Sequence, residues 1–152
     1  MQQYHDLIKR VMEEGIEVAD RTGVGTRSVF GHQMRFDLSK GFPAVTSKRL
    51  AWKAVVGELL WFIEGSTDER RLAELTYCKD RLVLVGKPTI WTANADAQGK
   101  SLGYTNNDSV KELGPVYGAQ WRKFGGIQGG DWGEDQLVSL INNISTSPDS
   151  RR

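Results

Sequence analysis

The sequence is poor in the residues that build disulfides and metal sites. Among its 152 residues only Cys78 is a cysteine, which excludes an internal disulfide and a cysteine-based zinc site. The two histidines, His5 and His32, are far apart in the chain, and no spacing typical of metal ligands occurs. We therefore expect no metal ion in this protein.

Long hydrophobic runs and an excess of one charge are also missing. No apolar stretch approaches the roughly 20 residues that a membrane-spanning helix needs. The N-terminal segment MQQYHDLIKR does not have the pattern of a signal peptide. The formal net charge is +1, which favours neither nucleic acid nor an anionic membrane as a partner. These absences predict a soluble, cytoplasmic protein.

What is present is the composition of an ordinary globular protein, with 39% hydrophobic and 26% charged residues. A chain of this length is predicted to form one domain with its own core. Apolar residues at helical spacing predict three helices, over residues 4–12, 50–64 and 137–144, and Gly15 and Gly65 are the expected ends of the first two. The second of these is apolar nearly all round, so we expect it to be buried inside the fold.

The segments between these helices give weaker signals. Alternating apolar and polar residues predict a half-buried strand over residues 34–38. Ser66 and Thr67 are expected to cap a further helix that begins in STDERRLAEL. The segment RLVLVGKPTIW is consistent with a short pair of strands. ANADAQGKSLGYTNNDS is predicted to be irregular surface, and LGPVYGAQWRKFGG to be turns around aromatic residues.

Glu58 is the first candidate for chemistry, because it lies among apolar residues in the helix predicted over 50–64. A buried carboxylate without a partner has a raised pKa, which suits proton transfer near neutral pH. The alternative is a solvated polar seam with a basic partner such as Lys53. The pattern leaves the two interpretations about equally favoured.

A glycine-rich turn, DRTGVGTR, is the second candidate. Backbone N–H groups at Gly23 and Gly25, with the guanidinium groups of Arg21 and Arg27, are suited to holding a phosphate. A plain turn between a helix and a strand is the simpler interpretation, and it is favoured. For the basic residue Lys48, too, the pattern favours an ordinary charged residue on the surface.

The aromatic residues Trp91, Tyr117 and Trp121 lie in glycine-flanked segments. They are suited to stacking on a flat ring system, although a small satellite core is the more common outcome. Cys78 is next to Lys79, which favours the thiolate, but no histidine is placed to serve as its base. We therefore do not expect Cys78 to be a nucleophile.

Several segments of the sequence, taken in order, resemble the N-terminal half of the thymidylate synthases. They are DRTGVGTRSVFGHQMRFDLSKGFPAVTSKR, GELLWFIEGST, TIWTANA, LGPVYGAQWRKFG, DQLVSLINNI and PDSRR. The resemblance extends from about Tyr4 to the end of the sequence and weakens around residues 72–87 and 126–133. It implies an α+β fold in which helices pack on a mixed β-sheet, with residues 1–152 as the N-terminal portion of a single domain.

The resemblance also implies a reaction, the reductive methylation of dUMP to dTMP. The co-substrate in this family is 5,10-methylenetetrahydrofolate, and no metal is involved. A cysteine of the enzyme adds to C6 of the uracil ring, and C5 then accepts the one-carbon unit. The enzymes are homodimers, and each active site takes residues from both chains.

By position, the resemblance gives roles to several residues of this sequence. Glu58 and Tyr117 would be catalytic, the first by handling protons at the uracil ring and the second by supporting the proton network. Arg21 would hold the nucleotide phosphate, and Arg151 and Arg152 would reach the phosphate in the other subunit's site.

Three further residues would face the folate: Lys48 toward its polyglutamate tail, and Trp91 and Asn94 beside its pteridine. The sequence departs from the family at Thr92, where an aspartate is common. This departure lies on the side of the folate, so it affects a polar contact there.

The family's nucleophile belongs to a proline-cysteine-histidine motif beyond the arginine pair, and the sequence ends before such a motif. Cys78 does not occupy that position. We therefore expect an incomplete domain that is inactive alone. Two alternatives stay open: a pyrimidine-nucleotide hydroxymethylase of the same superfamily, and a non-catalytic truncated chain that pairs with a full-length partner or is inert.

Overall fold

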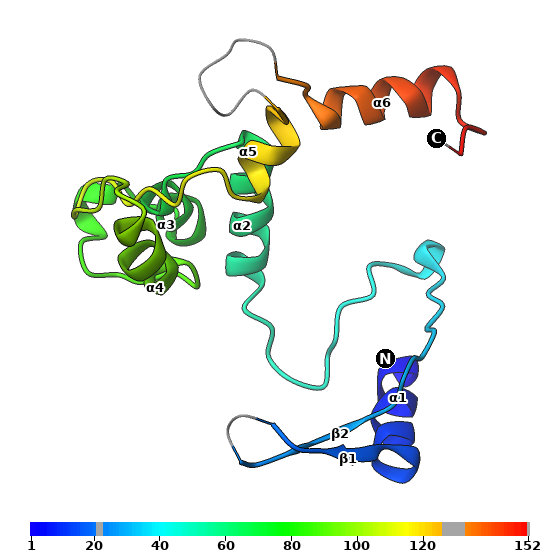
Figure 1. The fold of residues 1–152 in the computed structure, drawn as a ribbon. Coiled ribbons are helices and arrows are strands. Elements are labelled where there is room, and N and C mark those ends of the chain that lie inside the picture. Colours follow the sequence, from blue (N-terminus) through cyan, green and yellow to red (C-terminus); the bar gives the residue numbers. More distant parts are fainter. Residues whose placement is uncertain (21–22, 126–132, 152) are drawn as a thin grey trace. The chain divides into compact units, whose positions relative to one another are not determined.

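The computed structural model describes residues 1–20, 23–125 and 133–151. The chain forms two compact units, Met1–Leu50 and Ala51–Arg152. Figure 1 shows the helices and strands of both. Each unit is a separate cluster of contacts.

The first unit consists of one helix and one hairpin. Helix α1, Gln2–Glu14, confirms the helix predicted over residues 4–12, and it ends at a glycine as expected. Strand β1, Ile16–Val18, pairs with strand β2, Thr26–Ser28, in an antiparallel register that places Glu17 opposite Arg27. Strand β2 lies beside α1 (Figure 1).

The strand predicted over residues 34–38 is wrong. Residues 32–37 have irregular backbone, and a single 3-10 turn, η1 (Leu38–Lys40), follows them. The side chain of Asp37 caps this turn by accepting a 3.1 Å hydrogen bond from the backbone N–H of Ser39. A strand needs a neighbour to satisfy its backbone groups, and in the described part of this unit only β1 and β2 pair.

The second unit is helical. Helix α2 packs against both α3 and α5 (Figure 1). Two predictions are confirmed here, since α2 ends at Gly65 as expected and α6 covers the helix predicted over 137–144. The elements of this unit are α2 (Trp52–Glu64), α3 (Glu69–Tyr77), η2 (Arg81–Val83), α4 (Thr92–Asn94), the π-helical turn η3 (Ala95–Gly99), α5 (Tyr117–Arg122) and α6 (Gln136–Thr146).

The core of this unit is small and is centred on Trp61, which is fully buried. Its buried members come from four separate segments: Trp61, Leu72, Ala95 and Leu113. The indole N–H of Trp61 donates a 3.1 Å hydrogen bond to the backbone carbonyl of Asp68, so the one polar atom of this side chain is satisfied.

Several local predictions for this unit are wrong. The cap of α3 is Asp68, whose carboxylate accepts from the backbone N–H of Arg70, rather than Ser66 or Thr67. Where a strand pair was considered, the chain forms the turn η2 and irregular backbone. Helices occupy the two stretches predicted as irregular surface and as turns, namely α4 with η3, and α5. Their burial against the core stabilises these short helices, which local propensity does not favour.

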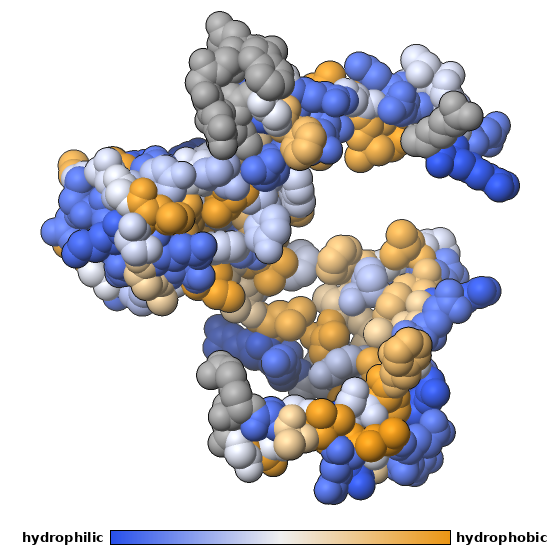
Figure 2. All heavy atoms as spheres, in the orientation of Figure 1, coloured by the Kyte–Doolittle hydropathy of each residue, from blue (hydrophilic) through white to orange (hydrophobic). Residues whose placement is uncertain are grey.

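Helix α2 is not buried all round, contrary to the prediction. Six apolar residues at positions i, i+3, i+4, i+7, i+8 and i+11 form an exposed stripe, here called the α2 stripe: Trp52, Val55, Val56, Leu59, Leu60 and Ile63. Their exposed fractions lie between 36% and 50%. Hydrophobic side chains are visible on the surface of both units (Figure 2). Among the described residues, no helix combines the length and the apolar character needed to cross a bilayer.

Candidate functional site

The centre of the candidate site is a hydrogen bond between Glu58 on α2 and Trp91, the residue just before α4. The indole Nε1–H of Trp91 donates to Glu58 Oε1 at 2.6 Å. Both side chains are partly buried. The partner of Glu58 is thus an aromatic N–H group rather than the basic residue Lys53 that was considered from the sequence. Glu58, predicted to be catalytic, and Trp91, predicted to face the folate, are thus joined by a direct hydrogen bond.

An aromatic cluster surrounds this bond, and Phe62 is at its centre. The rings of Tyr117 and Trp121 lie 5.4 Å and 5.5 Å from the Phe62 ring, both edge to face. The Trp91 and Tyr117 rings are 6.0 Å apart and inclined by 72°. Edge-to-face packing at these separations is favourable. The predicted aromatic set therefore does come together, on a phenylalanine that the sequence had not singled out.

The two sides of the cluster differ in exposure. Trp91 is half-buried, whereas Tyr117 is 57% exposed. Asn94 is also exposed and lies one helical turn after Trp91, on the same side of α4. The arrangement offers a carboxylate, a phenol and flat aromatic faces within one region, which suits a planar substrate that exchanges protons.

Behind the site lies a buried ion pair that sequence reasoning missed. Glu69 and Arg70, adjacent in the chain, are 0% and 2% exposed. Arg70 donates to Glu69 through both Nε, at 2.7 Å, and Nη2, at 2.6 Å. It also donates to the backbone carbonyls of Leu84 and Lys87. A buried pair of this kind is tolerated because its polar atoms are satisfied.

Glu69 is further bonded to two hydroxyl groups. Its Oε1 accepts from Thr89 Oγ1 at 2.7 Å and from Thr92 Oγ1 at 2.6 Å. Thr92 is the position where the sequence departs from the resembled family, and its hydroxyl is directed to this carboxylate. Glu69 and Arg70 belong to a run of charged residues, DERR, and such runs usually lie on the solvated surface. The local sequence therefore does not indicate this buried network.

A second charged network lies around Arg81, the first residue of η2. Arg81 forms ion pairs with Asp68 at 2.7 Å and with Glu74 at 2.8 Å. The hydrogen bonds from Arg81, followed by those from Arg71, outweigh partial desolvation and lower the pKa of Glu74 from 4.5 to about 2. The same carboxylates raise the pKa of Arg81. This network joins η2 to Asp68, the cap of α3, and to Glu74 within that helix.

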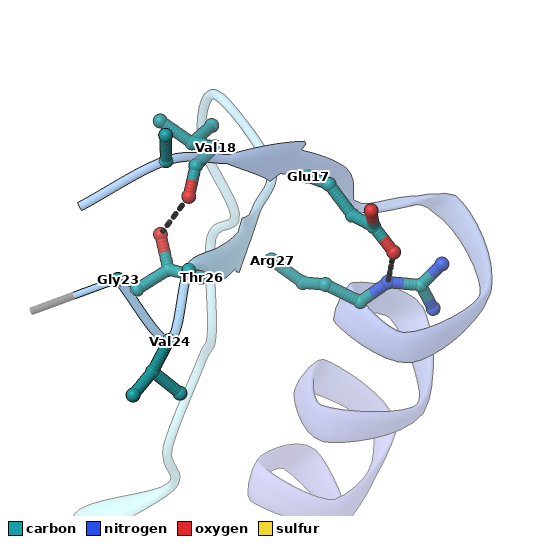
Figure 3. Close-up of a pocket in the computed structure, with 8 residues that line it drawn as sticks. Glu17, Val18, Gly23, Val24, Thr26 and Arg27 are labelled. Atoms are coloured by element: carbon teal, nitrogen blue, oxygen red, sulfur yellow. Dashed lines mark hydrogen bonds and ion pairs between the residues drawn. The ribbon is translucent and has the colours of Figure 1, made fainter.

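Residues of β1 and β2 and the glycines Gly23 and Gly25 line an open cavity of about 460 Å³ (Figure 3). The backbone N–H of Gly25 donates to the Asp20 carboxylate at 3.3 Å, and Gly23 and Gly25 both have φ near +78°, which favours glycine. Arg27 points toward α1, where it donates to the Met12 carbonyl. Arg21, the residue predicted to hold phosphate, lies outside the described residues.

Of the other predicted site residues, the structure describes Lys48 and Arg151. Lys48 is exposed and belongs to the first unit. Arg151 is exposed after α6, and Arg152 lies outside the described residues. Their roles therefore stay predictions.

Neither the thiol nor the acidic residues suggest a further catalytic group. Cys78 is exposed at the end of α3, and its sulfur donates to the backbone carbonyl of Leu75. Within residues 1–20, 23–125 and 133–151, no three or more His, Cys, Asp or Glu side chains gather in a way that could hold a metal ion.

Known proteins resemble this chain along its whole length. It is 47% identical over 152 residues to the thymidylate synthase of Enterobacteria phage T4 and, again at 47%, to the probable thymidylate synthase of Escherichia phage T5. Both alignments cover 100% of this chain, but 48% and 49% of the relatives. The chain thus spans about half the length of the relatives it matches.

The structural comparison agrees with the sequence comparison. The crystal structure of thymidylate synthase from T4 phage superimposes with a TM-score of 0.79, and the match covers 100% of this chain and 48% of that one. The predicted α+β fold is confirmed, with the described residues containing one two-stranded antiparallel sheet. The sequence model of the thymidylate synthase family matches residues 2–152. Because this match covers nearly every residue, the chain belongs to the thymidylate synthase family.

Proposed function

We propose that a complete domain containing this chain converts dUMP to dTMP by reductive methylation, with 5,10-methylenetetrahydrofolate as co-substrate. The observation that carries the proposal is the bond from Trp91 to Glu58 beside the exposed ring of Tyr117. It occurs in a chain 47% identical to the phage T4 thymidylate synthase, of which it covers about half. The activity is therefore assigned to the complete domain.

Glu58 is proposed to move protons at the uracil ring. Its Oε1 accepts the hydrogen bond from Trp91, and we assign its other oxygen, Oε2, to the substrate. A half-buried carboxylate flanked by apolar side chains is a suitable proton carrier. Tyr117, which is exposed, is proposed to extend the proton network.

The aromatic cluster fits the pteridine of the folate. Trp91 and Tyr117 present faces and edges that suit a flat, partly polar ring, and Asn94 lies one turn further along with its amide exposed. The co-substrate supplies the one-carbon unit and the reducing hydride. The residues of this chain bind and orient it, and Lys48 is proposed to bind the acidic tail.

The phosphate of dUMP is proposed to bind to arginines, because guanidinium groups match phosphate oxygens in charge and geometry. Arg21 would hold the phosphate within its own subunit. Arg151 and Arg152 would reach into the site of the other subunit, so a homodimer is part of the proposal. Cys78 has no part in it, and the cytoplasmic location stays a prediction from the sequence.

The test uses a complete enzyme, the T4 hybrid, in which residues 1–152 replace the aligned half of the phage T4 thymidylate synthase. With dUMP and methylenetetrahydrofolate, it is expected to form dTMP, and Cys78→Ser is expected to leave the rate unchanged. A hydroxymethylated nucleotide as the product would favour the hydroxymethylase alternative. Failure of a folded, dimeric T4 hybrid to turn over would favour a non-catalytic chain.

A further inference from the structure

The carboxylate of Glu69 lies next to the candidate site but is closed off from solvent. It is 0% exposed and accepts hydrogen bonds from Arg70, Thr89 and Thr92. Removing a charge this deep from water is costly, and the cost is offset only by these donors. The hydrogen bonds that satisfy the carboxylate also fix the positions of the donor side chains.

The two hydroxyl groups relay this constraint to the backbone around Trp91. Thr89 Oγ1 accepts a 3.2 Å hydrogen bond from the Trp91 backbone N–H, and Thr92 Oγ1 accepts a 2.8 Å bond from the Thr89 backbone N–H. Each hydroxyl therefore donates to Glu69 and accepts from the main chain. An acceptor-only group at position 69 is what aligns both hydroxyls in this direction.

Trp91 is thereby held at two ends. Its backbone N–H is bound through Thr89 to Glu69, and its indole N–H is bound to Glu58 at 2.6 Å. The ring is confined further by Trp61 and Phe62, whose centroids lie 6.0 Å and 6.3 Å away. With the backbone fixed, the indole N–H points at the Glu58 carboxylate.

We propose that Glu69 is a positioning residue, which holds Trp91 against Glu58 through the hydroxyl groups of Thr89 and Thr92. The hydroxyl of Thr92 is essential to this arrangement because it is both donor and acceptor. The effect of Glu69 on turnover rests on the proposed function. Its effect on Trp91 does not, and it is measured separately.

The experiment measures hydrogen exchange of the indole N–H groups in the 152-residue chain by ¹⁵N-edited NMR. The Trp91 signal is assigned with Trp91→Phe. The internal reference is Trp61, whose buried indole N–H is bonded to a backbone carbonyl. If Glu69 only stabilises the fold, its loss should raise the exchange rates of both indole N–H groups by the same factor. If Glu69 positions Trp91, its loss should raise the exchange rate of the Trp91 indole more than that of Trp61.

Thr92→Val, which removes the hydroxyl at nearly constant shape, is expected to speed Trp91 exchange about tenfold relative to Trp61. Thr92→Ser, which restores a hydroxyl, is expected to remain within about twofold of the original chain. Glu69→Leu, which removes both acceptor oxygens, should resemble Thr92→Val. The matched control is Glu64→Leu, since Glu64 pairs with Arg71 on the exposed surface.

The proposal is overturned if Thr92→Val leaves the ratio of Trp91 to Trp61 exchange unchanged, or if Thr92→Ser fails to restore it. An unprotected Trp91 indole in the original chain would overturn it as well. If Glu69→Leu does not fold, Thr92→Val and Thr92→Ser still decide the outcome. Because no turnover is measured, a T4 hybrid without activity would contradict the proposed function and leave this inference intact.

Discussion

Glu58 and Trp91, 33 positions apart in the sequence, are joined by a hydrogen bond of 2.6 Å between a carboxylate oxygen and an indole nitrogen. The bond needs only an acceptor on residue 58, so glutamine there can keep it. Charge and proton-carrying capacity can therefore be removed from Glu58 while its position is preserved.

For this reason Glu58→Gln in the T4 hybrid is expected to lower kcat by about 10²- to 10⁴-fold, the range for loss of a general acid or base. The KM for dUMP should change less than about threefold. Steady-state kinetics measure both, and Glu64→Gln serves as the control. An equal loss in kcat and in nucleotide binding would contradict the assigned proton transfer.

Arg151→Ala in the T4 hybrid is expected to weaken dUMP binding by about 1.5–3 kcal/mol, because a charged hydrogen bond to phosphate is lost. Deoxyuridine, which lacks the phosphate, should bind the variant and the parent equally. Calorimetric titration with both ligands makes the comparison, and Lys123→Ala is the control. Unchanged dUMP affinity would show that the exposed Arg151 is only a solvated side chain.

Close packing of α2 on α3 depends on a glycine. A β-carbon at Gly57 would lie 2.8 Å from Thr76 Oγ1 and 3.1 Å from its Cα. Gly57→Ala is therefore expected to lower the free energy of unfolding by about 1–3 kcal/mol, although alanine favours helices. Urea denaturation measures it. Gly31→Ala, with nothing within 4 Å of the added carbon, should be nearly neutral, and equal effects would refute the steric explanation.

The Arg81–Glu74 ion pair predicts a loss of stability in acid. The folded-state pKa of Glu74, about 2, lies below the ordinary 4.5, so the ionised form stabilises the fold. This contribution is fully present above about pH 4.5 and is lost as the pH falls toward 2. Since Glu74 keeps some exposure to solvent, we expect it to amount to about 1–2 kcal/mol.

Glu74→Gln should accordingly flatten the fall in unfolding free energy between pH 5 and pH 2, as measured by urea midpoints at several pH values. The exposed Asp149→Asn is the control for a general change in charge. A pH profile identical to that of the parent chain would exclude Glu74 as a source of the acid sensitivity.

The α2 stripe predicts association of the isolated 152-residue chain, because exposed apolar patches of this kind promote contacts between molecules. Sedimentation velocity should show an apparent mass that rises with concentration. Leu59→Lys combined with Val55→Lys should reduce this rise, whereas Leu82→Lys, outside the stripe, should not. A monomer at all concentrations would mean that the stripe is inert in water.

The sequence predicted the elements whose signal is local. Helices α1 and α6 follow apolar periodicity, and α2 ends at the expected glycine. Helix α4 and η3 were missed because packing decides them: at Gly99, an added β-carbon would lie 2.4 Å from the Glu112 carbonyl. No short window of sequence contains that neighbour.

The residues of the candidate site also fall into two groups, those that could be predicted from the sequence and those that could not. Motifs that resemble the family identified Glu58, Trp91 and Tyr117, and the structure brings these three together. The role of Glu69 could not be predicted, because its hydroxyl donors lie 20 and 23 positions away and its neighbours are charged. Distant hydrogen bonds leave no periodic pattern in a sequence.

The double use of the Thr92 hydroxyl has a consequence for how this chain can diverge from its relatives. The genetic code connects threonine with aspartate through asparagine or alanine. Asparagine offers an amide donor for Glu69 and an acceptor for the Thr89 backbone N–H, whereas alanine offers neither. Aspartate would place a second carboxylate against Glu69 and so raise the energy of the folded state. Evolutionary paths between threonine and aspartate here should pass through asparagine, and should reach aspartate only after residue 69 has lost its charge.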